Sequence, residues 1–262
     1  MKDIKVLQNK ILEIATYFDE FCRQNDIVYY LMGGSALGAV RHQGFIPWDD
    51  DFDVFMTYDN YQKFLKCAQE KLDKTKFYLQ KENTQEWPLF FTKLRMNNTL
   101  FLEPDTKDRD MHKGIFIDVF CLYNMSDNKF LALMQYLAAK LIVAKTLAQR
   151  GYPTASKPKK IMMALARVFV NKKLLLKIVQ GQTKKDTKKI ANFFGTARLN
   201  NISFAKEILG KPRYMPFENV NLPVPEKVEE YLTITYGDYM KLPSQDQIQK
   251  AIHSQQWSID VE

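Results

Sequence analysis

The sequence predicts an α+β protein, with a mixed β-sheet core in the first half of the chain and a helical second half. Before about residue 125, short β-rich runs alternate with amphipathic helical patterns, whereas residues 127–190 contain almost only helical patterns. The composition supports a folded core, because 46% of the 262 residues are hydrophobic and only 26% are charged. A disordered chain is excluded on the same grounds.

Apolar residues recur with clear helical or strand periodicity in the first half of the chain. Apolar residues recur at three- and four-residue steps in residues 2–24, which predicts the first helix. Residues 27–32 are typical of a buried strand, and a short helix follows at 36–41. Residues 51–56 alternate polar and apolar, as a strand does. The other elements predicted here are a helix at 58–72 and strands at 77–82, 89–96, 99–103 and 114–120.

The second half begins with helical patterns at 130–149, 158–179 and 183–194. Proline-rich extended segments follow, and then a helix at 226–236 that ends at Gly237. We therefore predict three parts, which are a core (1–125), a basic helical subdomain (126–195) and a C-terminal segment that packs back on the core (196–262).

The cysteines and the N-terminus indicate the compartment. Cys22, Cys67 and Cys121 are far apart and odd in number, which favours reduced thiols in a cytoplasmic protein. The first residues are charged and lack the apolar stretch of a signal peptide. No window of 18 uncharged apolar residues occurs, so we predict no transmembrane helix.

The net charge of +8 is concentrated in one segment. Residues 151–190 hold eleven Lys or Arg and one acid, a net charge of +10. Two interpretations remain open: a helical subdomain with a solvated basic face, or interfacial membrane helices with lysines at anionic headgroups. Nucleic acid is disfavoured as a partner, because the segment has no Trp and only one Tyr and one Phe on which bases could stack.

A pattern of glycines and acids carries the chemistry. Gly33, Gly34 and Ser35 join a predicted strand to a helix, where close backbone approach and free N–H groups suit an anion. Asp51 and Asp53, at i and i+2 on a predicted strand, point to the same face. Two such carboxylates repel each other unless a cation lies between them or one is protonated. Mg²⁺ or Mn²⁺ prefers such oxygen ligands.

Other side chains near this pattern are candidates for substrate contacts. Asp118 interrupts an apolar strand, where a lone carboxylate is costly without a metal or a firm partner. Lys93 and Arg95 share one face of a strand and can grip phosphate together. His42 is a candidate base or phosphate contact, or a residue hydrogen-bonded within its loop. The remaining candidates, any of which can instead be loop residues, are Arg41, Trp48, Asp49 and Asp50.

The order of these motifs resembles that of the LicD family of phosphotransferases. The resemblance is carried by Gly33–Asp53, Lys93-Leu94-Arg95, Gly114–Phe120 and Tyr231–Pro243, and it is strong over about residues 26–124. It implies a nucleotidyltransferase (polymerase-β-like) fold, with Asp51, Asp53 and Asp118 as catalytic residues that hold Mg²⁺ or Mn²⁺, two ions in all.

The reaction that the resemblance implies is metal-dependent transfer of phosphocholine from CDP-choline to a sugar hydroxyl. The implied acceptor is a lipid-linked precursor of a cell-surface glycan, of the teichoic acid or lipopolysaccharide type, at the inner face of the membrane. Three alternatives stay open: transfer of ribitol or glycerol phosphate from another CDP-alcohol, nucleotidyl transfer from a nucleoside triphosphate, or a non-catalytic membrane-binding module with a degenerate core.

The sequence departs from the family pattern after Asp118. The family strand runs on into a proline and soon an acid, whereas here it continues as Cys121-Leu122-Tyr123-Asn124. Acceptor specificity is the property that this departure puts in question. For a quaternary ammonium group, the aromatic residues that we consider are Tyr29, Tyr30, Trp87, Tyr123, Tyr236 and Tyr239.

Overall fold

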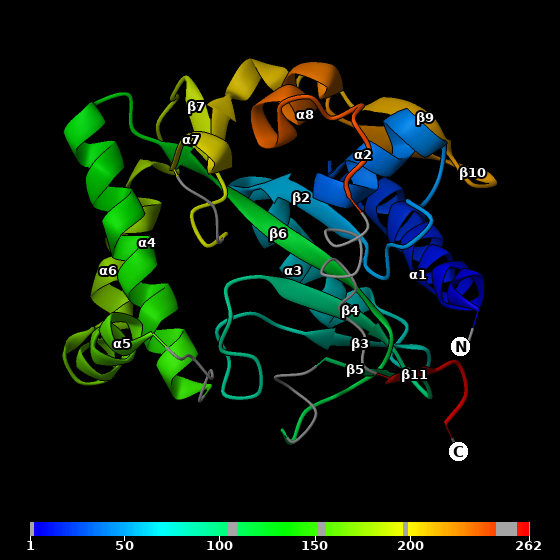
Figure 1. Ribbon diagram of the computed structural model, residues 1–262, viewed down its shortest axis with the longest axis horizontal. Coiled ribbons are helices and arrows are strands. Elements are labelled where there is room, and N and C mark those ends of the chain that lie inside the picture. Colours follow the sequence, from blue (N-terminus) through cyan, green and yellow to red (C-terminus); the bar gives the residue numbers. More distant parts are fainter. Residues whose placement is uncertain (1–2, 104–108, 151–155, 196–198, 245–255, 262) are drawn as a thin grey trace.

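The computed structural model describes residues 3–103, 109–150, 156–195, 199–244 and 256–261 (Figure 1). A mixed β-sheet forms its centre, and three helices from the predicted basic helical subdomain form a layer beside the sheet. This is the α+β architecture that the sequence predicts. The sheet, however, takes strands from both halves of the chain.

The central sheet is organised around its longest strand, β6 (Phe116–Met125). In spatial order its main path is β1 (Tyr30–Leu31), β2 (Asp53–Thr57), β6, β4 (Thr92–Met96) and β3 (Phe77–Gln80). Only β2 and β6 are parallel among these pairs. The far end of β6 pairs with β7 (Lys189–Ala191), which also pairs with β8 (Ser203–Ala205).

Two smaller antiparallel pairs lie outside this sheet. One is a hairpin of β9 (Arg213–Phe217) and β10 (Val220–Val224). The other joins β5 (Leu100–Leu102) to β11 (Gln256–Ser258). The strand predicted at 99–103 is therefore present as β5 but does not belong to the central sheet.

The helices of the core pack as their apolar stripes predict. The stripes of α1 (Ile4–Gln24) and α3 (Tyr58–Lys71) are buried against the sheet, and Figure 1 shows α3 behind it. Next to β2, α2 (Gly33–His42) packs against α8 (Val228–Tyr236). The remaining short helices of the described part are α7 (Leu199–Ile202), η1 (Gln180–Gln182) and η2 (Lys206–Ile208).

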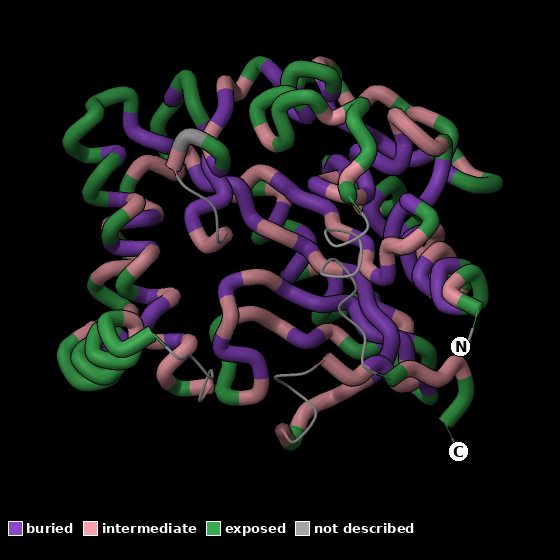
Figure 2. Tube along the Cα trace, viewed as in Figure 1, coloured by how far each residue is buried: buried purple, intermediate pink, exposed green. Residues whose placement is uncertain are grey.

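The helical layer consists of α4 (Lys129–Gln149), α5 (Lys157–Phe169) and α6 (Lys172–Val179). A buried amide, Gln135, fixes α4 to its neighbours by donating to the carbonyls of Asn124 and Val179 and accepting from Ser126 N–H. Figure 2 shows the difference in burial: the strands are mostly buried, whereas much of α5 is exposed. By length and hydropathy α4 could also cross a membrane, which the sequence did not predict.

Two helix predictions in the second half are wrong. The pattern at 158–179 divides into α5 and α6, because Val170 is extended and Asn171 starts a new helix by accepting from Leu174 N–H. The segment 183–194 is β7 with flanking turns, since its buried residues pair with β6 and β8. The predicted boundaries at 125 and 195 remain predictions, although β7 connects the middle part to the sheet.

The three cysteines form no disulfide, as predicted.

A further correction concerns Asp51, which lies in the loop just before β2 and not on the strand. The strand predicted at 51–56 thus begins two residues later, at Asp53. The shared strand face on which the pairing of Asp51 and Asp53 was argued therefore does not exist, and their proximity depends on the loop.

Candidate active site

A cavity of about 490 Å³ opens where α2, β2, β6 and α8 meet. Three carboxylates line one side of it, those of Asp49, Asp51 and Asp53, next to Gly33 and Gly34. Aromatic and aliphatic side chains from several elements form the rest of the wall. These include Phe91, Phe120, Leu122, Phe194, Phe204, Tyr231 and Tyr236. We call this the acid cavity.

The first turn of α2 closes the acid end of the cavity. Gly33 has a positive φ of 55°, which favours glycine, and its N–H donates to the Tyr231 hydroxyl at 3.0 Å. A Cβ on Gly34 would lie 2.6 Å from Oδ2 of Asp49, so the carboxylate has room only because the residue is glycine. The Ser35 hydroxyl accepts from Asp53 N–H at 2.8 Å and thereby ties α2 to the start of β2.

The parallel pairing of β2 and β6 brings two acids together that are far apart in sequence. Asp53 and Asp118 are register partners on these strands. Burial, together with the negative charges of Asp51, Asp118 and Asp49, raises the pKa of Asp53 well above its ordinary value. Burial also raises the pKa of Asp118 to about 6, although Lys93 opposes the shift. The site therefore concentrates negative charge where solvent cannot screen it.

Lys93 is the internal counter-ion of Asp118. Its ammonium nitrogen lies 3.0 Å from Oδ1 of Asp118 and 3.7 Å from Oε1 of Glu103. The same nitrogen lies 3.2 Å from the centre of the Phe116 ring. Only 1% of the Lys93 side chain is exposed, so the ammonium is available to neighbours within the protein rather than to solvent.

Arg95 is likewise committed to internal partners. It donates to Oε1 of Gln80 at 2.8 Å and to the Gly114 carbonyl at 2.7 Å, and burial lowers its pKa to about 10. The two side chains predicted to grip phosphate together, Lys93 and Arg95, are therefore both buried. Neither is among the described residues that line the acid cavity.

Of the other predicted contacts, only Asp49 is among the described residues that line the acid cavity, and the rest lie around it. Arg41 donates to the Tyr239 carbonyl and to Nε2 of His42, and burial and this guanidinium lower the pKa of His42. His42 lines a separate cleft of about 960 Å³. Trp48 packs against the hydrophobic core, and Asp50 is buried. Of the loop acids, Asp49 and Asp51 therefore reach the cavity.

The far wall is the part of the site that reasoning from the catalytic motif missed. Asn192, Phe194 and Gly195 line the cavity from the segment that was predicted to be a helix. Among the aromatic candidates for an ammonium site, Tyr236 is on the wall, whereas Tyr29, Tyr30 and Tyr123 are core residues. The Tyr231 and Tyr236 motif was the available signal for a contribution from the C-terminal part.

The described residues contain no group of three or more His, Cys, Asp or Glu side chains arranged to hold a metal ion. The predicted metal site of Asp51, Asp53 and Asp118 stays a prediction. The donors nevertheless have the right chemistry, because hard divalent cations take carboxylate oxygens. The crowding that raises the pKa of Asp53 would be relieved by such an ion.

Comparison with known proteins now adds to this geometry. Residues 26–130 match the family described as LicD/FKTN/FKRP, nucleotidyltransferase domain. The chain is also 27% identical, over 98% of its own length and 98% of the relative's, to the lipopolysaccharide cholinephosphotransferase LicD of Haemophilus influenzae. Residues 26–130 therefore form a LicD-family domain. A shorter match, 46% identity over 41 residues, joins it to an uncharacterized protein of Rickettsia prowazekii.

The LicD match divides the cavity in an informative way. All the acids and the glycine turn lie within residues 26–130. Phe194, Phe204, Tyr231 and Tyr236 lie outside that range but inside the full-length similarity to the LicD protein of Haemophilus influenzae. The acid end of the cavity is therefore built from the LicD-family domain, whereas much of the aromatic wall comes from later parts of the chain.

Proposed function

We propose that the protein transfers phosphocholine from CDP-choline to a sugar hydroxyl of a lipopolysaccharide-type glycan precursor. The observation that carries the proposal is the acid cavity itself, in which carboxylates and the α2 turn face an aromatic wall. The name of the Haemophilus influenzae relative supports the choice of phosphocholine and of lipopolysaccharide. The parallel pair of acid-bearing strands after α2 supports the nucleotidyltransferase fold as the framework.

The acid end would bind the diphosphate together with a divalent cation. Asp51 and Asp53 would hold Mg²⁺ or Mn²⁺, with donor phosphate oxygens completing the coordination. Such an ion keeps few protein ligands when a substrate phosphate is present, so two carboxylates are enough on the protein side. When bound, the cation would neutralise the charge that develops as the bond to phosphorus breaks.

The aromatic wall would receive the trimethylammonium group. Phe91 and Phe120 line the cavity with their ring centres 4.8 Å apart, and Phe194 and Tyr236 add further faces. Quaternary ammonium groups are attracted to aromatic faces, at about 0.5–2 kcal/mol for each favourable contact. The competing assignment is that the aromatic wall receives the nucleobase or a polyol of the donor. Selectivity among the donors distinguishes these occupants from choline.

The proposed chemistry balances without another reactant. The sugar oxygen attacks the phosphorus that carries choline, its bond to the bridging oxygen of CMP breaks, and CMP leaves. The hydroxyl proton needs an acceptor near neutral pH. Asp118 is not among the described residues that line the cavity, so it would take the proton through water, and its pKa, raised to about 6, suits this role.

The experiment supplies CDP-choline, CDP-ribitol, CDP-glycerol and CTP separately, with lipopolysaccharide that lacks phosphocholine and with teichoic acid as acceptors. We expect CMP release and labelled lipopolysaccharide only with CDP-choline and a divalent cation. Pyrophosphate release from CTP would replace the proposal with nucleotidyl transfer, and ribitol or glycerol transfer would replace its donor. No turnover with any donor would favour a non-catalytic core. The free thiols fit a reducing compartment, so we propose that the reaction takes place in the cytoplasm.

A further inference from the structure

The helical layer exposes two apolar stripes that the proposed reaction does not use. On α4, residues at helical spacing leave their side chains open to solvent: Phe130, Leu133, Met134, Leu137 and Leu141. On α5, a second set is exposed in the same way: Ile161, Met162, Leu165, Val168 and Phe169. The most exposed of them, Phe169, has 78% of its surface accessible. Such stripes are unusual on a surface that faces only water.

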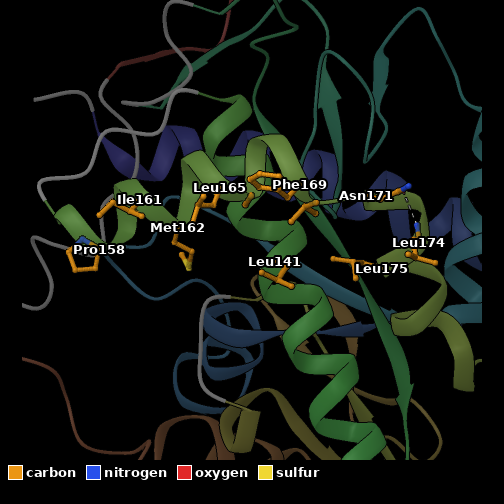
Figure 3. Close-up of a pocket in the computed structure, with 11 residues that line it drawn as sticks. Leu141, Pro158, Ile161, Met162, Leu165, Phe169, Asn171, Leu174 and Leu175 are labelled. Atoms are coloured by element: carbon orange, nitrogen blue, oxygen red, sulfur yellow. Dashed lines mark hydrogen bonds between the residues drawn. The ribbon is translucent and has the colours of Figure 1, made fainter.

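A groove of about 770 Å³ joins the stripes (Figure 3). Figure 3 shows Ile161, Met162, Leu165 and Phe169 along α5, with Leu141 of α4 nearby. The lining is apolar except for Asn171, whose side-chain oxygen already accepts from Leu174 N–H at 3.2 Å. The groove therefore offers hydrocarbon contact and almost no hydrogen-bonding groups to an occupant.

The charges on the same helices have one sign. Residues 129–179 contain eleven Lys or Arg and no Asp or Glu. Exposed basic side chains flank the apolar stripes on α5 and α6: Lys157, Lys160, Arg167, Lys173 and Lys177. A second copy of this surface would be repelled by its own charge, whereas an anionic surface would be attracted. Apolar stripes bordered by lysines are typical of helices that lie in a membrane interface.

We propose that α4, α5 and α6 form a docking surface for an anionic phospholipid bilayer. The apolar stripes would enter the boundary between headgroups and acyl chains, and the lysines would contact the phosphates. The opposite side of α4 is held in the fold by Gln135, so the helix lies on the bilayer rather than across it. This inference does not depend on the proposed function.

The docking surface is joined directly to the wall of the acid cavity. Lys140 of α4 donates to the Gly195 carbonyl at 2.6 Å, and Gly195 lines the cavity. Lys172 of α6 lies 5.2 Å from the centre of the Phe90 ring, which stacks on Phe194 of the cavity wall at 4.3 Å. A docked bilayer would therefore lie beside the cavity, where an acceptor carried on a lipid could reach it.

Vesicle sedimentation of the full chain tests the proposal. We expect binding to vesicles of phosphatidylcholine with about 30% phosphatidylglycerol and much weaker binding to pure phosphatidylcholine. Lys173→Glu/Lys177→Glu should weaken binding at least about tenfold, and Val168→Asp/Phe169→Asp should do the same. The matched control, Lys66→Glu/Lys74→Glu, makes the same charge change at exposed positions on and just after α3 and should bind like the wild type.

The outcomes that would overturn the proposal are specific. No binding to the anionic vesicles, or equal weakening by the control variant, would show that these helices are not the docking surface. A dimer in light scattering that Val168→Asp/Phe169→Asp abolishes, with no vesicle binding, would make the surface a self-association site. Binding is measured without substrate, so failure of the proposed reaction leaves this result interpretable.

Discussion

Beside the acid cavity, the charges of Lys93 and Asp118 are mostly buried and pair with each other, whereas on the helical layer the charges are all of one sign and many are exposed. Asp118 and Lys93 form an ion pair with 13% and 1% of their side chains exposed. On α5 and α6, lysines such as Lys173 and Lys177 lie in solvent, and apolar side chains such as Leu174 and Phe169 are exposed beside them. Buried charge is costly unless it is compensated, so it indicates a site where chemistry uses it.

Apolar residues show the reverse distribution in the two regions. The face of the sheet that α1 and α3 cover is packed with aromatic and aliphatic side chains, while α5 leaves most of its apolar residues outside. The protein's own packing therefore encloses the acid cavity, whereas the exposed apolar surface of the helical layer suits a partner that covers it. The predictions below test the cavity side of this contrast in order of decreasing effect.

Asp53→Asn should lower the rate of phosphocholine transfer by about 10³-fold, because it removes a carboxylate of the proposed cation site. Folding stability should be unchanged or higher, since burial and nearby acids already disfavour the charge of Asp53. Steady-state kinetics and urea unfolding provide the two measurements. Asp59→Asn, at an exposed position on α3, is the matched control. Comparable transfer rates for Asp53→Asn and Asp59→Asn would show that Asp53 is not part of the site.

Lys93→Met should destabilise the fold by about 3 kcal/mol at neutral pH, because it leaves the buried Asp118 without its counter-ion. Urea unfolding measures the loss. In the double variant with Asp118→Asn much of the stability should return, because the uncompensated charge is then absent. If the double variant lost as much stability as the two single variants together, the pair would not be coupled.

Gly34→Ala should reduce kcat/KM about 30-fold, because the new methyl group would displace the Asp49 carboxylate by an ångström or so. Gly181 is the matched control, since a Cβ there meets nothing within 4 Å. Kinetics of both variants with CDP-choline check the prediction. Equal activity of Gly34→Ala and Gly181→Ala would mean that the turn does not contact the reacting groups.

The pH dependence of stability should reveal the crowded acids. The folded-state pKa values of Asp53 and Asp118 are raised above the ordinary value of 3.8, the latter to about 6. The folded state therefore keeps protons that the unfolded chain has lost, and this contribution to stability falls as the pH rises from about 4 through 6. Mg²⁺ should raise Tm by about 3 °C at about pH 8 and by less at about pH 5. Asp53→Asn should shrink that difference, and calorimetry that shows an equal Mg²⁺ effect at both pH values would contradict the prediction.

Local patterns were enough to predict the elements that depend on local physics. The apolar stripes of α1, α3 and α4 and the glycine turn of α2 are visible in the sequence because each is set by neighbours a few residues away. The region 183–194 shows the limit, since its spacing fits a helix but the edge of β6 pairs with it as a strand. Tertiary pairing outweighed local preference there.

The site was predictable in its acids but not in its surroundings. Asp51 and Asp53 stood out because they follow the glycine turn at positions i and i+2, and Asp118 because it interrupts an apolar run. The burial of Lys93 and Arg95 could not be read in the same way, because a strand pattern does not show which partners cover it. The aromatic wall comes from five separate parts of the chain, and they meet only because of the topology.

The hydrogen bond from Gly33 N–H to the Tyr231 hydroxyl connects residues that are 198 positions apart. On the ribosome, the glycine turn therefore emerges long before the tyrosine that closes it. A nascent chain cannot complete its cavity until almost all of the described sequence has been translated. Premature release of the polypeptide would leave the carboxylates together without a closed pocket, so partial products of translation are expected to lack activity.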